Sequence, residues 1–234
     1  MKGKTALITG AGRGIGRAAA VALAQAGANV VINYAGNETT ALETEKLCKK
    51  AGAETFLIKG NVEKAQDCAK MVEETVKRFG RIDILVNNAG IYPACRYDEY
   101  SPELFQKVNN LNVLGTFMVI KSAVKIMEKQ RKGVILNTSS MAGIDGAMGN
   151  IGYTASKFGV EGLTLGLARE LGPKGIRVNG VAPAGIDRTD LDGNIIISNV
   201  KLSDEEVINR LKEKLRQQDE TYTAVIQVDH SYVL

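Results

Sequence analysis

The stretch Thr9-Gly10-Ala11-Gly12-Arg13-Gly14-Ile15-Gly16 decides the fold. A short apolar run over 5–8 precedes it, and a helical pattern of apolar and small residues follows over 18–24. This order of strand, glycine-rich turn and helix places backbone N–H groups at a helix N-terminus, where a diphosphate can bind. Glycine also permits positive φ and lets a ligand approach the backbone without a Cβ in the way. A purely structural turn is the alternative, and the position between a strand and a helix favours phosphate binding.

The glycine spacing differs from the common dinucleotide fingerprint G-x-G-x-x-G, because Ile15 and Arg17 stand where its last glycine would lie. The pattern is instead T-G-x-x-x-G-x-G, with glycine at Gly10, Gly14 and Gly16. This pattern resembles the nucleotide-binding turn of the short-chain dehydrogenase/reductase family.

The length and composition are those of one globular α/β domain over 1–234. A hydrophobic content of 44% with 24% charged residues argues against disorder and against a membrane protein. No apolar run approaches the roughly twenty residues that a membrane-spanning helix needs. The N-terminal residues 1–4 lead into a strand too short for a signal-peptide core, so we expect a cytoplasmic protein.

Several kinds of site are disfavoured by residue counts. The three cysteines are scattered without a CxxC pair, which predicts reduced thiols and neither a disulfide framework nor a zinc site. His230 is the one histidine, so a histidine-based triad or metal site would depend on it, and we expect no bound metal. The net charge is +4, and the basic residues are interspersed with acidic ones along the chain. This pattern favours an anionic cofactor or substrate over nucleic acid.

Strand and helix patterns alternate along the chain, which predicts βαβ units. We therefore expect a Rossmann-type, doubly wound, mainly parallel sheet with helices on both faces. Ser101 and Pro102 are typical of a helix start, and that helix is expected to run to about 128. The expected strands cover 5–8, 29–33, 55–58, 82–86, 134–137 and 176–181, and further helical patterns cover 41–48, 62–79 and 152–171.

The end of the second strand bears on cofactor choice. NAD-selective folds place an acid there for the ribose 2′-OH, whereas this chain has Asn33 and Tyr34 and no acid before Glu38. Arg13 inside the glycine turn could bind a 2′-phosphate through its guanidinium. These residues favour NADP(H) over NAD(H), the alternative being that Arg13 is only a solvated turn residue.

Tyr153 and Lys157 form the one Tyr-x-x-x-Lys pair and share a face of a predicted helix. Such a pair can be a solvated face, but this one follows the fifth strand, near the edge where strand C-termini gather a site. An ammonium beside the phenol would lower the tyrosine pKa and make it a general acid/base near neutrality. Ser140, after the same strand, is either a turn residue or a donor to a substrate carbonyl oxygen.

Together these motifs resemble the short-chain dehydrogenase/reductase family over residues 1–190. The glycine turn is joined by Asn-Asn-Ala-Gly at 87–90, by Asn112, and by Ser140 thirteen residues before Tyr153. The resemblance implies that Tyr153 protonates the alkoxide during carbonyl reduction and that Lys157 holds the nicotinamide ribose and lowers the tyrosine pKa. It implies that Ser140 polarises the carbonyl and that Asn112 anchors a water in the proton relay. The cofactor supplies the hydride.

The resemblance also implies a set of cofactor contacts and a branch of the family. The segment 33–38 is most similar to 3-oxoacyl-[acyl-carrier-protein] reductases of fatty acid biosynthesis, which implies a 3-oxoacyl thioester substrate, although sugar, steroid and alcohol reductases share the pattern. The expected cofactor-binding residues are Gly10, Arg13, Gly14, Ile15, Gly16, Asn33, Tyr34, Asn61, Val62, Asn88, Ala89, Gly90, Tyr153, Lys157, Pro183 and Ile186.

The chain departs from the family pattern in three places. Asn61 stands where the family has an aspartate that contacts adenine, and after Pro183 the usual Pro-Gly becomes Pro-Ala-Gly. The C-terminal part, 191–234, is abbreviated: a capping box at 203–206 opens a helix, a last strand is expected over 222–229, and there is no room for a further helix between them.

An NADP(H)-dependent oxidoreductase acting on a carbonyl or secondary alcohol is the leading hypothesis. The alternative is an NADP(H)-binding scaffold or redox-sensing regulator, and a nucleic-acid-binding role ranks third. Apolar residues on the helices around Asn112 and Tyr153 exceed what one inward stripe needs, so we expect a homodimer. A homotetramer is the alternative. It is less favoured, because relatives build the second interface from C-terminal elements that are altered in this chain.

Overall fold

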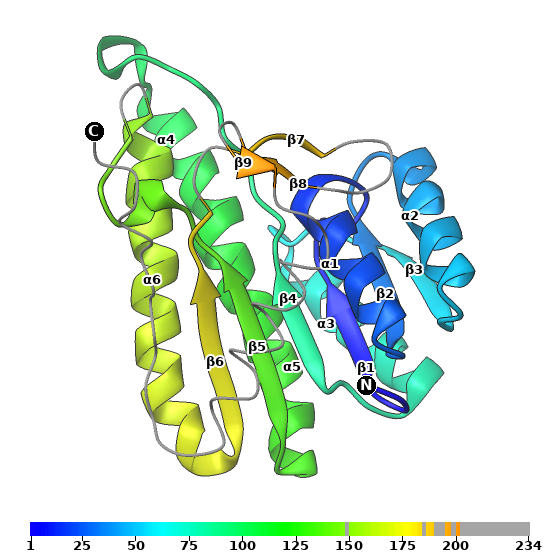
Figure 1. Ribbon diagram of the computed structural model, residues 1–234. Helices are drawn as coiled ribbons and strands as arrows, with labels where there is room; N and C mark the ends of the chain where they lie inside the picture. The colour runs from blue at the N-terminus through cyan, green and yellow to red at the C-terminus, as the bar shows by residue number, and fades with distance from the viewer. Residues whose placement is uncertain (148–149, 184–185, 190–194, 198–199, 202–234) are drawn as a thin grey trace.

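The protein is built around a six-stranded parallel sheet in the computed structural model, which describes residues 1–147, 150–183, 186–189, 195–197 and 200–201. The strand order is β3-β2-β1-β4-β5-β6, so the order reverses beside β1 (Figure 1). All five ladders are parallel, which requires crossovers of the kind that helices supply. The strands are β1 (Thr5–Ile8), β2 (Asn29–Tyr34), β3 (Thr55–Lys59), β4 (Ile84–Asn87), β5 (Gly133–Thr138) and β6 (Ile176–Val181).

Helices cover both faces of this sheet, which confirms the predicted doubly wound fold. One face packs against α1 (Gly14–Gln25) and α2 (Glu38–Lys50). The other packs against α3 (Ala65–Phe79), α5 (Thr116–Gln130) and the end of α6 (Ile151–Leu171). The short helix α4 (Pro102–Asn109) precedes α5 and contacts α6.

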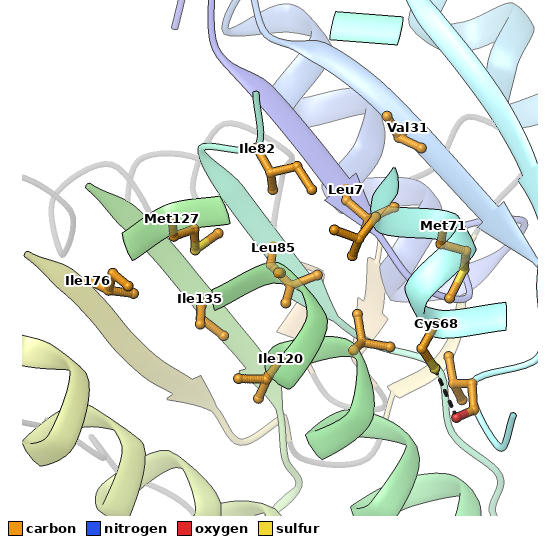
Figure 2. Close-up of a cluster of buried hydrophobic side chains, with 14 of the residues drawn as sticks. Leu7, Val31, Cys68, Met71, Ile82, Leu85, Ile120, Met127, Ile135 and Ile176 are labelled. Carbon is orange, nitrogen blue, oxygen red and sulfur yellow. Dashed lines mark hydrogen bonds between the residues drawn. The ribbon is translucent and has the colours of Figure 1, made fainter. Parts of the chain in front are cut away.

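Two apolar cores follow from the alternation of side chains along the strands. Ala6 and Ile8 of β1 lie in the core on the α1 and α2 side, and Leu7 between them lies in the opposite core. All three are fully buried, as expected for a parallel strand covered on both faces. Figure 2 shows the second core, in which side chains from the sheet meet Met71 of α3 and Ile120 and Met127 of α5.

The predicted long helix from Ser101 begins where expected but is interrupted. The Ser101 hydroxyl accepts a hydrogen bond from the Leu104 N–H (3.1 Å), and Pro102 follows as the first helical residue. A π-helical turn, η2 (Asn110–Gly115), then separates α4 from α5. Such turns commonly occur at functional sites, and this one holds Asn112. Helical periodicity alone did not distinguish the insertion from a continuous helix.

The structure differs from the sequence predictions at other element ends. The predicted fourth strand began at Ile82, whereas β4 begins at Ile84. Just before it, the Asp83 side chain accepts hydrogen bonds from the Thr5 N–H, Lys4 and Arg81. The helix predicted from Val62 begins at Ala65. Short 3-10 turns are η1 (Tyr97–Glu99), η3 (Met141–Gly143) and η4 (Gly172–Lys174).

A second, three-stranded antiparallel sheet was not predicted. It comprises β7 (Ile186–Thr189), β8 (Ile195–Ile197) and β9 (Val200–Lys201), and β7 and β8 contact α1. Figure 1 shows these strands next to α1. The helix predicted from Ser203, the strand predicted over 222–229 and His230 lie outside the described residues.

Candidate active site

The glycine turn joins β1 to α1 at the point where the strand order reverses. Gly10 and Gly14 have φ of +62° and +58°, a region that favours glycine. A Cβ added at Gly10 would lie 2.9 Å from the Ala89 Cα, and one at Gly16 would lie 2.5 Å from the Asn88 Nδ2. A Cβ at Gly14 would meet nothing within 4 Å. The turn is therefore packed against the Asn-Asn-Ala-Gly segment on one side and open at Gly14.

Thr9 holds that segment against the glycine turn. Its hydroxyl accepts hydrogen bonds from the N–H groups of Asn88 (3.0 Å) and Ala89 (3.1 Å) and donates to the Val86 carbonyl (3.4 Å). The Asn88 side chain donates in return to the Thr9 and Gly10 carbonyls, each at 3.2 Å. No role was predicted for Thr9, although its place as the first residue of the motif could have indicated one.

The expected cofactor residues at the end of β2 are buried. The Asn33 Oδ1 accepts from the Gly10 N–H (3.2 Å), and its Nδ2 donates to the Gly60 carbonyl (3.0 Å). Asn33 therefore links the glycine turn to the end of β3. Burial raises the pKa of the Tyr34 phenol, as does the nearby carboxylate of Glu38. An acid thus lies close to the end of β2, although it follows the strand in sequence.

The two arginines near the turn have different surroundings. Arg17 is buried, and its guanidinium donates to the Gly12 carbonyl (2.8 Å), the Thr44 hydroxyl (3.0 Å) and Glu43 (2.8 Å). It thereby fastens the turn to α2. Arg13, the N-cap residue of α1, is exposed, and Ile15 is half-buried. Arg13 is therefore the arginine of this turn that a bound anion could reach.

Asn61 and Val62 follow β3. The Asn61 Oδ1 accepts from the Glu63 N–H (3.0 Å), and its backbone N–H donates to Asp67 (2.8 Å), so its side chain shapes its own loop. Val62 is buried, and a Cβ added at Gly115 would lie 2.9 Å from its Cγ2. Pro183 is half-buried, its carbonyl accepts from the Met141 N–H (3.0 Å), and Ile186 is the first residue of β7.

Tyr153, Lys157 and Ser140 come together at the carboxyl end of β5. The Ser140 hydroxyl lies close enough to the Tyr153 phenol to lower its pKa. The Lys157 Nζ donates to the Thr138 carbonyl (2.7 Å) and lies 5.4 Å from the centroid of the Tyr153 ring. The structure thus assembles the hydroxyl, the phenol and the ammonium that the sequence placed 13 and 4 residues apart.

The pKa of Tyr153 is raised above its ordinary value, chiefly by burial, with the Ser140 hydroxyl lowering it and Tyr92 raising it. Burial lowers the pKa of Lys157 to about 8, and the carboxylate of Glu161 opposes this. Burial is thus the largest influence on the Tyr153 pKa, and the expectation that Lys157 lowers it stays a prediction.

Asn112 is 1% exposed in the π-helical turn. Its Oδ1 accepts from the Ile91 N–H (2.9 Å), and its Nδ2 donates to the Ile91 carbonyl (3.1 Å) and the Ser156 hydroxyl (3.0 Å). A Cβ added at Gly90 would lie 3.3 Å from the same Oδ1. The Asn112 side chain therefore ties the loop after β4 to α6, while its expected role in anchoring a water stays a prediction.

Asn150 and Tyr92 are site residues that the sequence analysis missed. Asn150 caps α6 by accepting from the Tyr153 N–H (3.1 Å), and it donates to the Pro93 carbonyl (2.7 Å). Tyr92, on the loop so held, is 57% exposed and packs edge-to-face on Tyr153, with centroids 4.7 Å apart. The N-cap preference for asparagine could have indicated Asn150, whereas no sequence pattern indicated Tyr92.

Within the ranges that the structure describes, no group of three or more histidine, cysteine, aspartate or glutamate side chains could hold a metal ion. None of the helices described there is long and apolar enough to cross a membrane.

The sequence model of the short chain dehydrogenase family matches residues 4–199. The chain belongs to the short-chain dehydrogenase/reductase family. It is accordingly an oxidoreductase with the Rossmann-type fold of that family.

Curated relatives and solved structures agree with this membership. A 3-oxoacyl-[acyl-carrier-protein] reductase FabG of Staphylococcus aureus is 43% identical over 80% of this chain and 77% of its own length. An uncharacterized oxidoreductase of Thermotoga maritima is 44% identical over 92% of this chain and 83% of its own. The solved structure of NAD⁺-bound xylitol dehydrogenase has a TM-score of 0.76 at 35% identity, covering 78% of this chain and 70% of that one. Levodione reductase has a TM-score of 0.76 at 36% identity, covering 80% and 73%.

Proposed function

We propose that this chain is an NADP(H)-dependent reductase that interconverts a carbonyl and a secondary alcohol, with a 3-oxoacyl thioester as the favoured substrate. The observation that carries the proposal is the assembly of Ser140, Tyr153 and Lys157 at one end of the sheet. A scaffold or regulator that only binds the cofactor has no need for this assembly, so the enzyme is favoured over that alternative.

The residues of the glycine turn fit a dinucleotide. The turn is open at Gly14, where an added Cβ would meet nothing within 4 Å, and α1 begins at this residue. The first N–H groups of a helix have no intrahelical partners, so they are available to a bound diphosphate. We assign the diphosphate to Gly10, Gly14, Ile15 and Gly16 and the adenosine part to Asn33, Tyr34, Asn61 and Val62. We assign the nicotinamide ribose and its surroundings to Asn88, Ala89, Gly90, Tyr153, Lys157, Pro183 and Ile186.

The mechanism follows from the groups around Tyr153. The bound nicotinamide supplies or accepts the hydride. Tyr153 donates its phenolic proton to the carbonyl oxygen as that oxygen gains negative charge, and a raised pKa keeps the phenol protonated at neutral pH. Ser140 holds the same oxygen by a hydrogen bond. Lys157 favours the phenolate that remains, because an ammonium stabilises a nearby anion.

The proposed preference for NADP(H) rests on Arg13. This residue is exposed at the start of α1, so its guanidinium can bind a 2′-phosphate. Asn33 offers no acid for a ribose 2′-OH, and its side chain is already bonded to Gly10 and Gly60. Glu38 lies close to Tyr34, and an acid near the end of β2 favours NAD(H) over NADP(H). The preference is therefore a balance between Arg13 and Glu38 that binding measurements can decide.

The substrate class is supported by relatives named as 3-oxoacyl-[acyl-carrier-protein] reductases in Staphylococcus aureus and Synechocystis. The test is NADPH oxidation with 3-oxoacyl thioesters, keto sugars and simple ketones at matched concentrations. We expect the highest kcat/KM with a 3-oxoacyl thioester. Turnover of another class alone would reassign the substrate, and no turnover of any would favour the scaffold.

We also infer that two copies pair through α5 and α6. These helices and the π-helical turn before α5 expose several large apolar side chains on the described part of the chain: Leu114, Phe117, Ile151, Phe158 and Leu165. Apolar side chains gathered on neighbouring helices favour burial by a partner, here a second copy. Light scattering at micromolar concentration should give the mass of a dimer, with a tetramer as the alternative, and an active monomer would refute this inference.

A further inference from the structure

Glu161 is a buried acid on the catalytic helix α6. It is 7% exposed, and neither of its carboxylate oxygens has a hydrogen-bond partner among the described residues. Buried polar groups are normally hydrogen-bonded and buried charges are normally paired, because desolvation without compensation is costly. An unpartnered carboxylate at this depth therefore points to a role beyond packing.

The carboxylate lies between α6 and β6. A Cβ added at Gly180 of β6 would lie 3.7 Å from the Glu161 Oε2, so the glycine leaves the space that the acid occupies. Thr164 borders the same space, but its hydroxyl donates to the Val160 carbonyl (2.8 Å) and accepts from the Asn137 side chain (2.9 Å). The nearby hydroxyl is thus already bonded elsewhere.

Lys157 is a buried cation on the same helix. It precedes Glu161 by one helical turn on the same face of α6 and is 6% exposed. Its ammonium donates a hydrogen bond to the neutral carbonyl of Thr138. Around it, α6 contributes the titratable Tyr153 and Glu161, while β5 and η3 contribute backbone at Thr138 and Gly143. The Glu161 carboxylate raises the pKa of Lys157, which burial lowers to about 8.

We propose that Glu161 is a positioning residue whose ionised carboxylate keeps Lys157 in the ammonium form that the reaction needs. The proposal rests on the proposed function, because that function gives Lys157 its role. Charges buried in the same low-dielectric region interact with little screening, so the carboxylate acts on Lys157 without a direct ion pair.

The first test replaces Glu161 by glutamine, which keeps the shape and removes the charge. In E161Q the ammonium loses its stabilisation, so the upper limb of the kcat/KM profile for NADPH-dependent reduction moves to lower pH by about one unit. The control is E170Q, the same change at an exposed position on α6, which leaves the limb in place. A limb unchanged in E161Q, or moved equally in E170Q, overturns the proposal.

A second pair of measurements separates charge from packing. In the Tyr153→Phe background the phenol cannot titrate, so the pH dependence of NADPH affinity reports on Lys157. We expect this affinity to fall as the pH rises, and adding E161Q should move the fall to a pH about one unit lower. A purely structural role would instead lower the melting temperature and leave this pH dependence unmoved.

A third measurement needs no folded E161Q. Carboxyl ¹³C NMR of glutamate-labelled wild-type protein, with the signal assigned in E161Q or E161D, should find Glu161 ionised at pH 7, and a protonated acid overturns the proposal. This result is independent of turnover. If the wild type reduces no carbonyl with NADPH, the proposed function fails while the NMR result still decides the charge of Glu161.

Discussion

Two regions meet at the same edge of the sheet: the glycine-turn region, which is the turn at 9–16 with the segments bonded to it, and the catalytic-helix region, which is α6 with the residues packed on it. They are stabilised in different ways. In the first, the polar side chains of Thr9, Asn33 and Asn88 bond to backbone groups and fix the course of the chain. In the second, Lys157 and Glu161 are buried ionisable groups with few partners. The hydrogen bonds of the first region therefore fix the backbone conformation, whereas the second region keeps ionisable groups buried. Substitutions in the two should therefore fail differently.

The largest expected effect is on turnover in the catalytic-helix region. Tyr153→Phe removes the proton donor and preserves the ring that packs on Tyr92. We expect kcat to fall by about 10²–10⁴. Steady-state NADPH oxidation with the best substrate of the panel measures this. Wild-type rates in the variant would remove Tyr153 from the mechanism.

In the glycine-turn region, Thr9→Ala should act on stability and cofactor binding together. It leaves the part-buried N–H groups of Asn88 and Ala89 without their acceptor, which should cost about 0.5–1.5 kcal/mol for each hydrogen bond lost. Chemical denaturation measures the loss, and Thr9→Ser, which keeps the hydroxyl, is the matched control. Equal stabilities of wild type and Thr9→Ala would show that the hydroxyl does not hold the region together.

Arg13→Ala sharpens the comparison within the glycine-turn region, because Arg13 is exposed, in contrast to the buried Arg17. We expect NADPH affinity to fall about tenfold and NADH affinity to stay nearly constant, since a charge-assisted contact to phosphate is lost. Fluorescence titration with both cofactors measures this. A parallel loss of both affinities would assign Arg13 to the diphosphate instead.

The smallest expected effect is a pH dependence of the wild type. The pKa of Lys157 is lowered to about 8, so the ammonium is complete below that pH and is lost above it. We expect kcat/KM to fall as pH rises through about 8, by up to tenfold between pH 7 and 9. A rate that stays flat to pH 9.5 would show that the lysine charge is not needed.

Much of this arrangement could be predicted, because its signals are local. Apolar runs gave the six strands, Ser101 gave a helix start, and the Tyr153–Lys157 spacing gave two groups on one face. Contacts between distant segments could not be predicted in this way. The Tyr92 ring reaches Tyr153 through a loop, and the Tyr153 pKa depends on burial that only packing determines.

The division between the two regions is tested most directly by titrating NADPH into Tyr153→Phe and Thr9→Ala side by side, with wild type and Thr9→Ser as references. We predict that Tyr153→Phe binds NADPH within about twofold of wild type, since the lost hydroxyl acts on the substrate, whereas Thr9→Ala binds at least about tenfold more weakly. Weakened binding in Tyr153→Phe together with unchanged binding in Thr9→Ala would contradict the account.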